Sequence, residues 1–68
     1  MGKIHYSVED DKLSIDFEDS NRTVFLRGQT EGKEFHIKNE DFELFPGLSD
    51  SDRKDIRAVL KNSNVVFD

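Results

Sequence analysis

Apolar and polar residues alternate along the first part of the chain. The first run, residues 4–8, and the second, residues 13–17, each set three apolar side chains between polar ones. A period of two residues is typical of a half-buried strand, and the polar segment 9–11 between the runs suits a hairpin turn. We therefore predict two antiparallel strands joined by a short turn.

Two further runs and one ambiguous segment follow. Residues 23–26 are apolar on both faces, which is typical of a central strand or of a strand that lies under a helix. A loop containing two glycines at 28–32 and an alternating run at 34–38 then predict a fourth strand. Residues 39–48 carry apolar side chains without a clear period, so a strand, a loop and a lid are all open alternatives there.

The second half of the chain begins with a break and continues as a helix. Pro46-Gly47 interrupts any regular element, and Ser49 with Asp52 fits a capping box, in which each residue bonds the backbone of the other. Apolar side chains then recur at helical spacing at Ile56, Val59 and Leu60. The pattern predicts a helix over 49–62, followed at 65–67 by a short strand or an apolar tail.

Together these elements predict an α+β fold, an antiparallel meander of four or five strands with one C-terminal helix packed on the sheet. Nothing in the composition divides the chain, so residues 1–68 are expected to form a single domain. The expected core combines one face of each strand with the helix stripe, and consists of Ile4, Tyr6, Val8, Leu13, Ile15, Phe17, Phe25, Leu26, Phe35, Ile37, Phe42, Leu44, Ile56, Val59 and Leu60.

Composition indicates a folded chain with a charged surface. Only 34% of the residues are hydrophobic and 37% are charged, but six phenylalanines argue against disorder. Without cysteine, a chain of 68 residues has no disulfide to support its small core, so self-association as a homodimer is one expected means of stabilisation. No stretch is apolar enough to span a membrane, and the N-terminus lacks the features of a signal peptide, so we expect a cytoplasmic protein without a membrane partner.

Charge is unevenly distributed along the chain, whose net charge is −5. Residues 39–52 carry five acids and no base, whereas residues 21–38 and 53–68 are each net positive. One interpretation is that these segments pair and neutralise each other. The other is an acidic patch that binds a basic partner or mimics the phosphates of a nucleic acid. The candidate residues of this patch are Glu40, Asp41, Glu43, Asp50 and Asp52.

The predicted helix carries a second group of charges. Arg53, Arg57 and Lys61 recur every four residues and therefore lie along one flank. A solvated helix face is the plainer interpretation of this basic flank, and a contact with phosphate groups is the other. Because the chain as a whole is acidic and nucleic-acid-binding domains are usually strongly basic, nucleic acid is not the expected partner.

The sequence offers little for catalysis or metal binding. There is no cysteine, the serines lie in turns or at the helix cap, and no glycine-rich phosphate loop is present. His5 and His36 alternate with apolar residues and are expected to face solvent. They would approach each other and Glu34 as metal ligands only if the first and fourth strands were neighbours. We therefore predict a protein that is not an enzyme, with no catalytic residue, no metal and no cofactor.

The expected function is that of a small non-catalytic protein-binding or regulatory module, which acts through an acidic surface or a sheet edge. The alternative is a nucleic-acid-mimicking inhibitor of a DNA- or RNA-handling protein. A third hypothesis is weak nucleic-acid binding through the bases of the helix. In the first two hypotheses the partner is another protein, whose identity the sequence leaves open.

Overall fold

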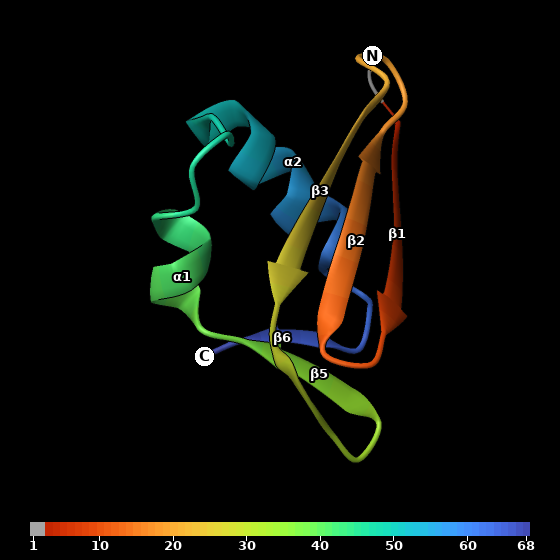
Figure 1. Ribbon diagram of the computed structural model, residues 1–68, viewed down its shortest axis with the longest axis vertical. Helices are drawn as coiled ribbons and strands as arrows, with labels where there is room; N and C mark the ends of the chain where they lie inside the picture. Colours follow the sequence, from red (N-terminus) through yellow and green to blue (C-terminus); the bar gives the residue numbers. More distant parts are fainter. Residues whose placement is uncertain (1–2) are drawn as a thin grey trace.

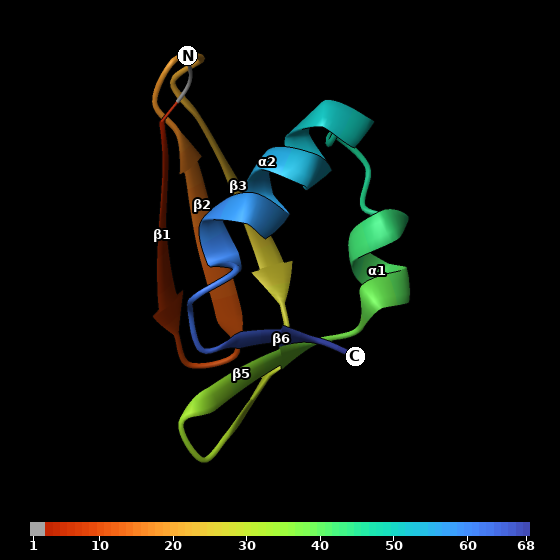
Figure 2. The same cartoon turned by 180° about the vertical axis from the view of Figure 1, so that it is seen from behind.

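The computed structural model describes residues 3–68 of the chain, which contain six strands and two helices (Figures 1 and 2). The strands are β1 (Ile4–Glu9), β2 (Lys12–Phe17), β3 (Arg22–Arg27), β4 (Gln29–Glu31), β5 (Glu34–Ile37) and β6 (Val65–Phe67). The helices are α1 (Asn39–Glu43) and α2 (Asp50–Leu60). The predicted α+β class is confirmed.

The strands form two sheets and not the single meander that the sequence predicted. Sheet A contains β1, β2 and β3 in that order, all antiparallel. Sheet B contains β4, β5 and β6, with β4 antiparallel and β6 parallel to β5. The segment 23–26 lies in β3 at an edge of sheet A, so its predicted central position is wrong. Val24 and Leu26 on its inner face pack against the core, whereas Phe25 on its outer face is 54% exposed, so the strand is covered on one face only.

The turn residues explain why β1, β2 and β3 pair in sequence. Asp10 and Asn21 each have a φ of 52°, a left-handed conformation that Asp and Asn tolerate better than most residues. In the resulting register Tyr6 lies opposite Ile15 and Val8 opposite Leu13. Residues opposite each other point to the same face of the sheet, so the apolar side chains of the three strands, apart from Phe25, share one inner face.

The chain passes from sheet A to sheet B at Gly28. Its N–H donates to the carbonyl of Asp11 (2.9 Å), which extends the pairing of β3 with β2, and the next residue already pairs with β5. A Cβ at position 28 would lie only 2.4 Å from the carbonyl oxygen of His36. The loop predicted over 28–32 is therefore the strand β4 followed by a turn at Gly32, where φ is 62°.

The ambiguous segment begins with a helix, α1, so the prediction of a single helix is wrong. The second helix, α2, starts as predicted: the Ser49 hydroxyl accepts the Asp52 N–H (3.0 Å), and the Asp52 carboxylate accepts the Ser49 N–H (3.1 Å). It ends at Leu60, two residues before the predicted end. Residues 65–67 form a strand, which selects the first of the two alternatives for the C-terminal segment.

The core lies between the inner face of sheet A, sheet B and the two helices. The buried hydrophobic residues are Leu13, Ile15, Phe17, Leu26, Phe35, Ile37, Phe42, Leu48, Ile56 and Leu60. Leu48 was not predicted, and Ile4 is only partly buried against this cluster. Five predicted core residues are instead exposed, namely Tyr6, Val8, Phe25, Leu44 and Val59. Neither helix in residues 3–68 is long and apolar enough to cross a membrane.

Candidate functional site

The outer edge of β1 is open in the described part of the chain, because β1 is the terminal strand of sheet A. The N–H of Glu18 donates to the carbonyl of Lys3 (3.0 Å), which fixes the phase of the hydrogen bonds between β1 and β2. In an antiparallel pair the bonded residues alternate. The N–H and C=O groups of Ile4, Tyr6 and Val8 therefore point away from β2, toward the open edge, where they can pair with another strand.

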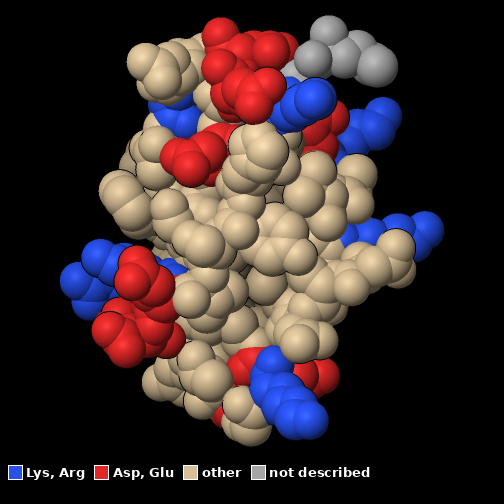
Figure 3. Space-filling view, turned by 90° about the vertical axis from the view of Figure 1, so that its right-hand side faces the viewer, with Lys and Arg blue, Asp and Glu red and all other residues tan. Residues whose placement is uncertain are grey.

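Apolar side chains accompany these unpaired backbone groups. Tyr6 and Val8 lie on the inner face of sheet A, yet each is 41% exposed. Their position explains the exposure, because an edge strand has a neighbouring strand on one side only, and its side chains are open to solvent on the other. Figure 3 looks onto the side of the molecule where β1 lies, and a broad uncharged area occupies its centre between charged groups at the margins. The edge of β1 thus combines backbone donors and acceptors with accessible apolar surface.

A groove of about 260 Å³ extends this surface from β1 toward sheet B. Its apolar walls are Tyr6, Val8, Phe35 and Val65, and Thr30, Lys33, Glu34 and Asn64 complete its lining. Pockets that enclose small-molecule ligands usually measure about 300–1,000 Å³. The groove is therefore better matched to one or two side chains of an added strand than to a whole ligand.

The other sheet edges are less suited to pairing with a partner. Strands β4 and β6 contain three residues each, and β3 begins and ends with an arginine. Short strands and charged residues are the usual means by which edges are protected. A second groove of about 340 Å³ lies beside β3 and is lined in part by Phe25, which is 54% exposed. Among the edge strands within residues 3–68, β1 is the six-residue strand that contains no Lys or Arg.

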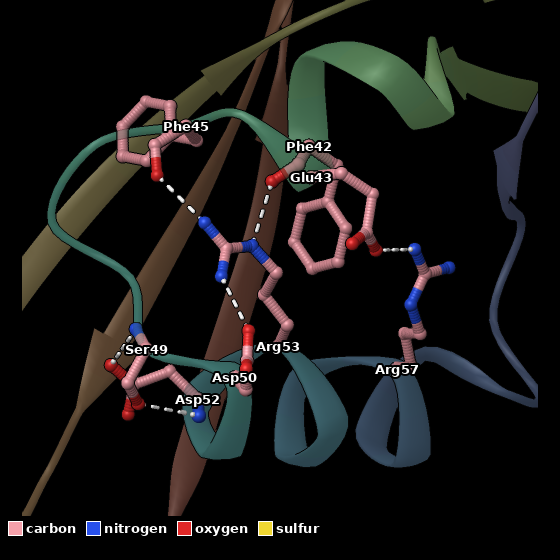
Figure 4. Close-up of polar contacts among 8 residues, drawn as sticks. All are labelled: Phe42, Glu43, Phe45, Ser49, Asp50, Asp52, Arg53 and Arg57. Atoms are coloured by element: carbon pink, nitrogen blue, oxygen red, sulfur yellow. Dashed lines mark hydrogen bonds and ion pairs between the residues drawn. The ribbon is translucent and has the colours of Figure 1, made fainter.

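The acidic patch predicted from the sequence is partly neutralised within the chain (Figure 4). The ion pairs that involve it are Arg22–Asp52 (2.9 Å), Arg53–Asp50 (3.3 Å) and Arg57–Glu43 (2.7 Å). Glu40 and Asp41 form no ion pair with any residue of 3–68 and lie in the first turn of α1. The structure therefore favours the interpretation in which segments of opposite charge become neighbours.

Asp52 caps the start of α2 and also forms an ion pair with Arg22. The backbone N–H of Ser49 and, to a lesser extent, the Arg22 guanidinium hold the pKa of Asp52 below its ordinary value. Arg22 also donates to the carbonyl of Gly47 (3.0 Å) and lies over the ring of Phe17, 4.3 Å from its centroid. This carboxylate is thus part of the contact between β3 and α2 and already has its cation.

Arg53 holds the segment before α2 in place. Its Nε donates to the carbonyl of Phe42 (3.1 Å) and its terminal nitrogen to that of Phe45 (3.0 Å), as Figure 4 shows. Its side chain is only 13% exposed, whereas the paired Asp50 is fully open to solvent. The last carbonyls of a helix need donors, and Arg53 supplies one to Phe42 in the last turn of α1 and one to Phe45 just after it. Its guanidinium therefore faces the protein.

Arg57 is also engaged within the chain. Its guanidinium carbon lies 4.7 Å from the ring centroids of both Phe42 and Phe67, and it donates to the Asn39 side chain as well as to Glu43. Lys61, the last member of the predicted basic flank, follows α2 and is exposed. The structure does not bring the three bases together as one free surface.

The two histidines lie in separate places. His5 is on the outer face of β1 and contacts Glu18 (3.1 Å). His36, in β5, has its Nδ1 3.0 Å from Asp68 and its Nε2 3.2 Å from Glu34, and its side chain is 19% exposed, so it is partly buried rather than fully solvent-facing as predicted. No cluster of three His, Asp or Glu side chains suited to a metal ion occurs within residues 3–68.

The contacts of His36 predict a pH-dependent stability. The hydrogen bond with Asp68 raises the pKa of His36 above its ordinary value of 6.5, helped by the charges of Asp68 and Glu31 and opposed by desolvation. A raised pKa means that the native state binds the proton more tightly, so this stabilisation is full below about pH 6.5 and is lost as the pH rises through the folded-state pKa. Urea unfolding should therefore show a decrease in stability as the pH rises above about 6.5, and His36→Gln should reduce this decrease.

His5→Gln is the control for this prediction, because it removes the other histidine and leaves the Asp68 contact intact. Arg27, Lys38 and Asp41 line the same groove as His36, and none of them changes in either variant. If His36→Gln and wild type lose stability equally over this range, the contact with Asp68 does not stabilise the fold.

The sequence analysis did not identify the exposed apolar residues at the edge of β1. Tyr6 and Val8 were predicted to be core residues because they alternate with polar residues. Alternation shows which face a side chain points to, but it does not show whether that face is covered. The signal that was present is the absence of Lys, Arg, Asp and Glu from residues 4–8 in a chain that is 37% charged.

No family model matches the chain, and comparisons with curated proteins and with solved structures gave no match either.

Proposed function

We propose that the chain is a small non-catalytic protein-binding module that takes an extended segment of another polypeptide onto the open edge of β1. The observation that carries this proposal is the coincidence, on one strand, of outward backbone groups with the exposed side chains of Tyr6 and Val8. In strand addition, main-chain hydrogen bonds supply affinity and pockets for alternate side chains supply specificity. The groove between β1 and sheet B is such a pocket.

The acidic-surface hypotheses stay predictions with less support. A nucleic-acid mimic needs carboxylates that are free to face a basic partner, and three of the five candidates already face an arginine of the same chain. Weak nucleic-acid binding through the helix would need the guanidinium groups of Arg53 and Arg57, which contact backbone carbonyls and aromatic rings. The expected cytoplasmic location also stays a prediction.

Replacing Tyr6 by proline should abolish strand addition while sparing the sheet. Peptides selected from a random library against the chain should bind the wild type, shift the backbone amide resonances of Ile4, Tyr6 and Val8, and slow their hydrogen exchange. Proline at position 6 removes an outward N–H and none of the bonds to β2, so the affinity of these peptides should fall at least about tenfold.

Matched variants separate the edge from other effects. Thr23→Pro places the same change at an outward position of β3 and should leave peptide binding intact, and Tyr6→Ala reports the loss of the side chain alone. Glu40→Gln with Asp41→Asn tests the acidic surface. Peptides that bind the Tyr6→Pro variant as well as wild type, or that depend on Glu40 and Asp41, would show that β1 is not the binding edge.

A further inference from the structure

We infer that the segment that adds to β1 is β1 of a second copy of this chain, antiparallel to the first about a twofold axis through Tyr6. This inference rests on the proposed binding edge and names its occupant. It is carried by the self-complementarity of residues 3–9, in hydrogen bonding, in apolar side chains and in charge.

The hydrogen-bond phase of β1 selects the register. The outward groups belong to Ile4, Tyr6 and Val8, and a twofold antiparallel pair can join only residues whose groups point toward each other. With Tyr6 on the axis, Tyr6 faces Tyr6 of the second copy, and Ile4 faces its Val8. All three outward residues then find a partner. An axis through His5 or Ser7 would leave Val8 or Ile4 without a partner among these residues.

Charge supports the same register. With Tyr6 on the axis, Lys3 lies opposite Glu9 of the second copy, and symmetry repeats this pair at the other end of the interface. Opposite charges directly across neighbouring strands stabilise a sheet, whereas like charges destabilise it. Neither Lys3 nor Glu9 forms an ion pair with another residue of 3–68. The remaining outer-face pair is His5 with Ser7, so no like charges face each other.

The apolar surface is covered in the same arrangement. A twofold axis perpendicular to the sheet keeps the inner faces of both copies on one side, so Tyr6 and Val8 of each chain lie beside Ile4, Tyr6 and Val8 of the other. Ile4 of the second copy comes to lie next to Val8, at the groove between β1 and sheet B. A chain this small, with no disulfide, gains the apolar burial that its own core lacks.

Charge reversal tests the register directly. Sedimentation equilibrium at concentrations up to about 1 mM should show a monomer–dimer equilibrium for wild type. Lys3→Glu and Glu9→Lys should each raise the dimer dissociation constant about tenfold or more, since each puts like charges opposite one another twice. The double variant, K3E/E9K, should recover most of the wild-type affinity, because exchanging the two residues places opposite charges across the interface again.

This rescue cannot come from within one chain. Inside a protomer Lys3 lies opposite Glu18 and Glu9 opposite Lys12, so the double variant leaves both of these positions with like charges. Circular dichroism checks that each variant is folded. A double variant that dimerises no better than the single variants would overturn the inferred register.

A cross-linking variant gives an independent result. The chain contains no cysteine, so Tyr6→Cys introduces a single thiol. Directly opposed residues of a hydrogen-bonded pair lie about 5.5 Å apart at Cα, within the range of a disulfide. Tyr6→Cys should oxidise to a disulfide-linked dimer much faster than Phe25→Cys, an exposed position on β3. Equal rates would overturn the inference.

The outcome also distinguishes this inference from the proposed function. Wild type that stays monomeric at about 1 mM, while selected peptides still protect the amides of β1, refutes the second copy as occupant and leaves strand addition standing. A monomer to which no peptide adds at β1 refutes both. A dimer that Lys3 and Glu9 do not influence refutes this interface and points to another edge.

Discussion

Replacing Arg53 by methionine should lower the free energy of unfolding by about 2–4 kcal/mol. Methionine keeps much of the side-chain volume but donates no hydrogen bond, so the carbonyls of Phe42 and Phe45 lose the donors that now lie 3.1 and 3.0 Å away. Hydrogen bonds from a charged group contribute about 1.5–3 kcal/mol each, and the Phe42 carbonyl would keep only its longer bond from the Phe45 N–H (3.4 Å). A chain of this length is expected to have a total stability of roughly 3–10 kcal/mol.

Urea unfolding measures this change, and Lys54→Met is the matched control. Lys54 is adjacent in sequence and exposed, and its side chain forms no hydrogen bond or ion pair with another residue of 3–68, so its replacement should change stability by less than about 0.5 kcal/mol. Arg53→Lys should recover only part of the loss, because an ammonium group cannot reach two separate carbonyls with the geometry of a guanidinium. Similar values for Arg53→Met and Lys54→Met would show that Arg53 does not hold α1 against α2.

This role changes how nucleic-acid binding through the helix is to be tested. Loss of a mobility shift in an Arg53 variant would report unfolding as readily as a lost phosphate contact. Lys54 and Lys61 are exposed and lie away from the carbonyls that Arg53 binds, so substitutions there test the charge of the helix with little cost in stability.

Local features of the fold could be predicted because they depend on neighbouring residues. The hairpin between β1 and β2 follows from two alternating runs and a polar turn in which Asp10 takes a left-handed conformation. The start of α2 follows from Ser49 and Asp52, whose side chains bond each other's backbone. In each case the sequence contains both the element and the residues that mark one of its ends.

The pairing of strands could not be predicted in the same way. Alternation in residues 34–38 indicates a strand but says nothing of its neighbours, and β5 pairs with β6, which is nearly thirty residues away in sequence. The helix α1 is only five residues long, and its backbone is tied to the C-terminal segment by the bond from the Asn39 N–H to the Asp68 carbonyl (2.8 Å). Long-range contacts decide such elements, and periodicity does not record them.

The candidate site was predicted in kind but not in place. A sheet edge was one of two expected interaction surfaces, while the residues named for an interface were charged. The structure places five of those eight charged residues in ion pairs within the chain, and it exposes Tyr6 and Val8 instead. Whether an inner-face residue is covered depends on the position of its strand in the sheet, which only the tertiary arrangement determines.

Replacing Gly28 by alanine should destabilise the fold by about 2–4 kcal/mol, because the new methyl group has no room. Its Cβ would lie 2.4 Å from the carbonyl oxygen of His36 and 2.7 Å from the ring of Phe35. The ring can move, but the carbonyl belongs to β5 and cannot yield without shifting sheet B. Overpacking of this kind typically costs about 1–3 kcal/mol and more where backbone must move. Thermal unfolding should register it as a decrease in melting temperature of roughly 4–8 °C per kcal/mol.

Gly32→Ala separates lack of space from loss of conformational freedom. Gly32 has a φ of 62° and nothing within 4 Å of the position that an added Cβ would take, so alanine there costs only the strain of a left-handed residue, about 1–2 kcal/mol. Gly28 needs no such conformation, so its larger penalty must come from the approach of β5. Hydrogen exchange should localise the difference, with amides of β4 and β5 losing protection in Gly28→Ala while those of β1 and β2 keep it. A smaller loss for Gly28→Ala than for Gly32→Ala would mean that the two sheets do not depend on close contact at this crossing.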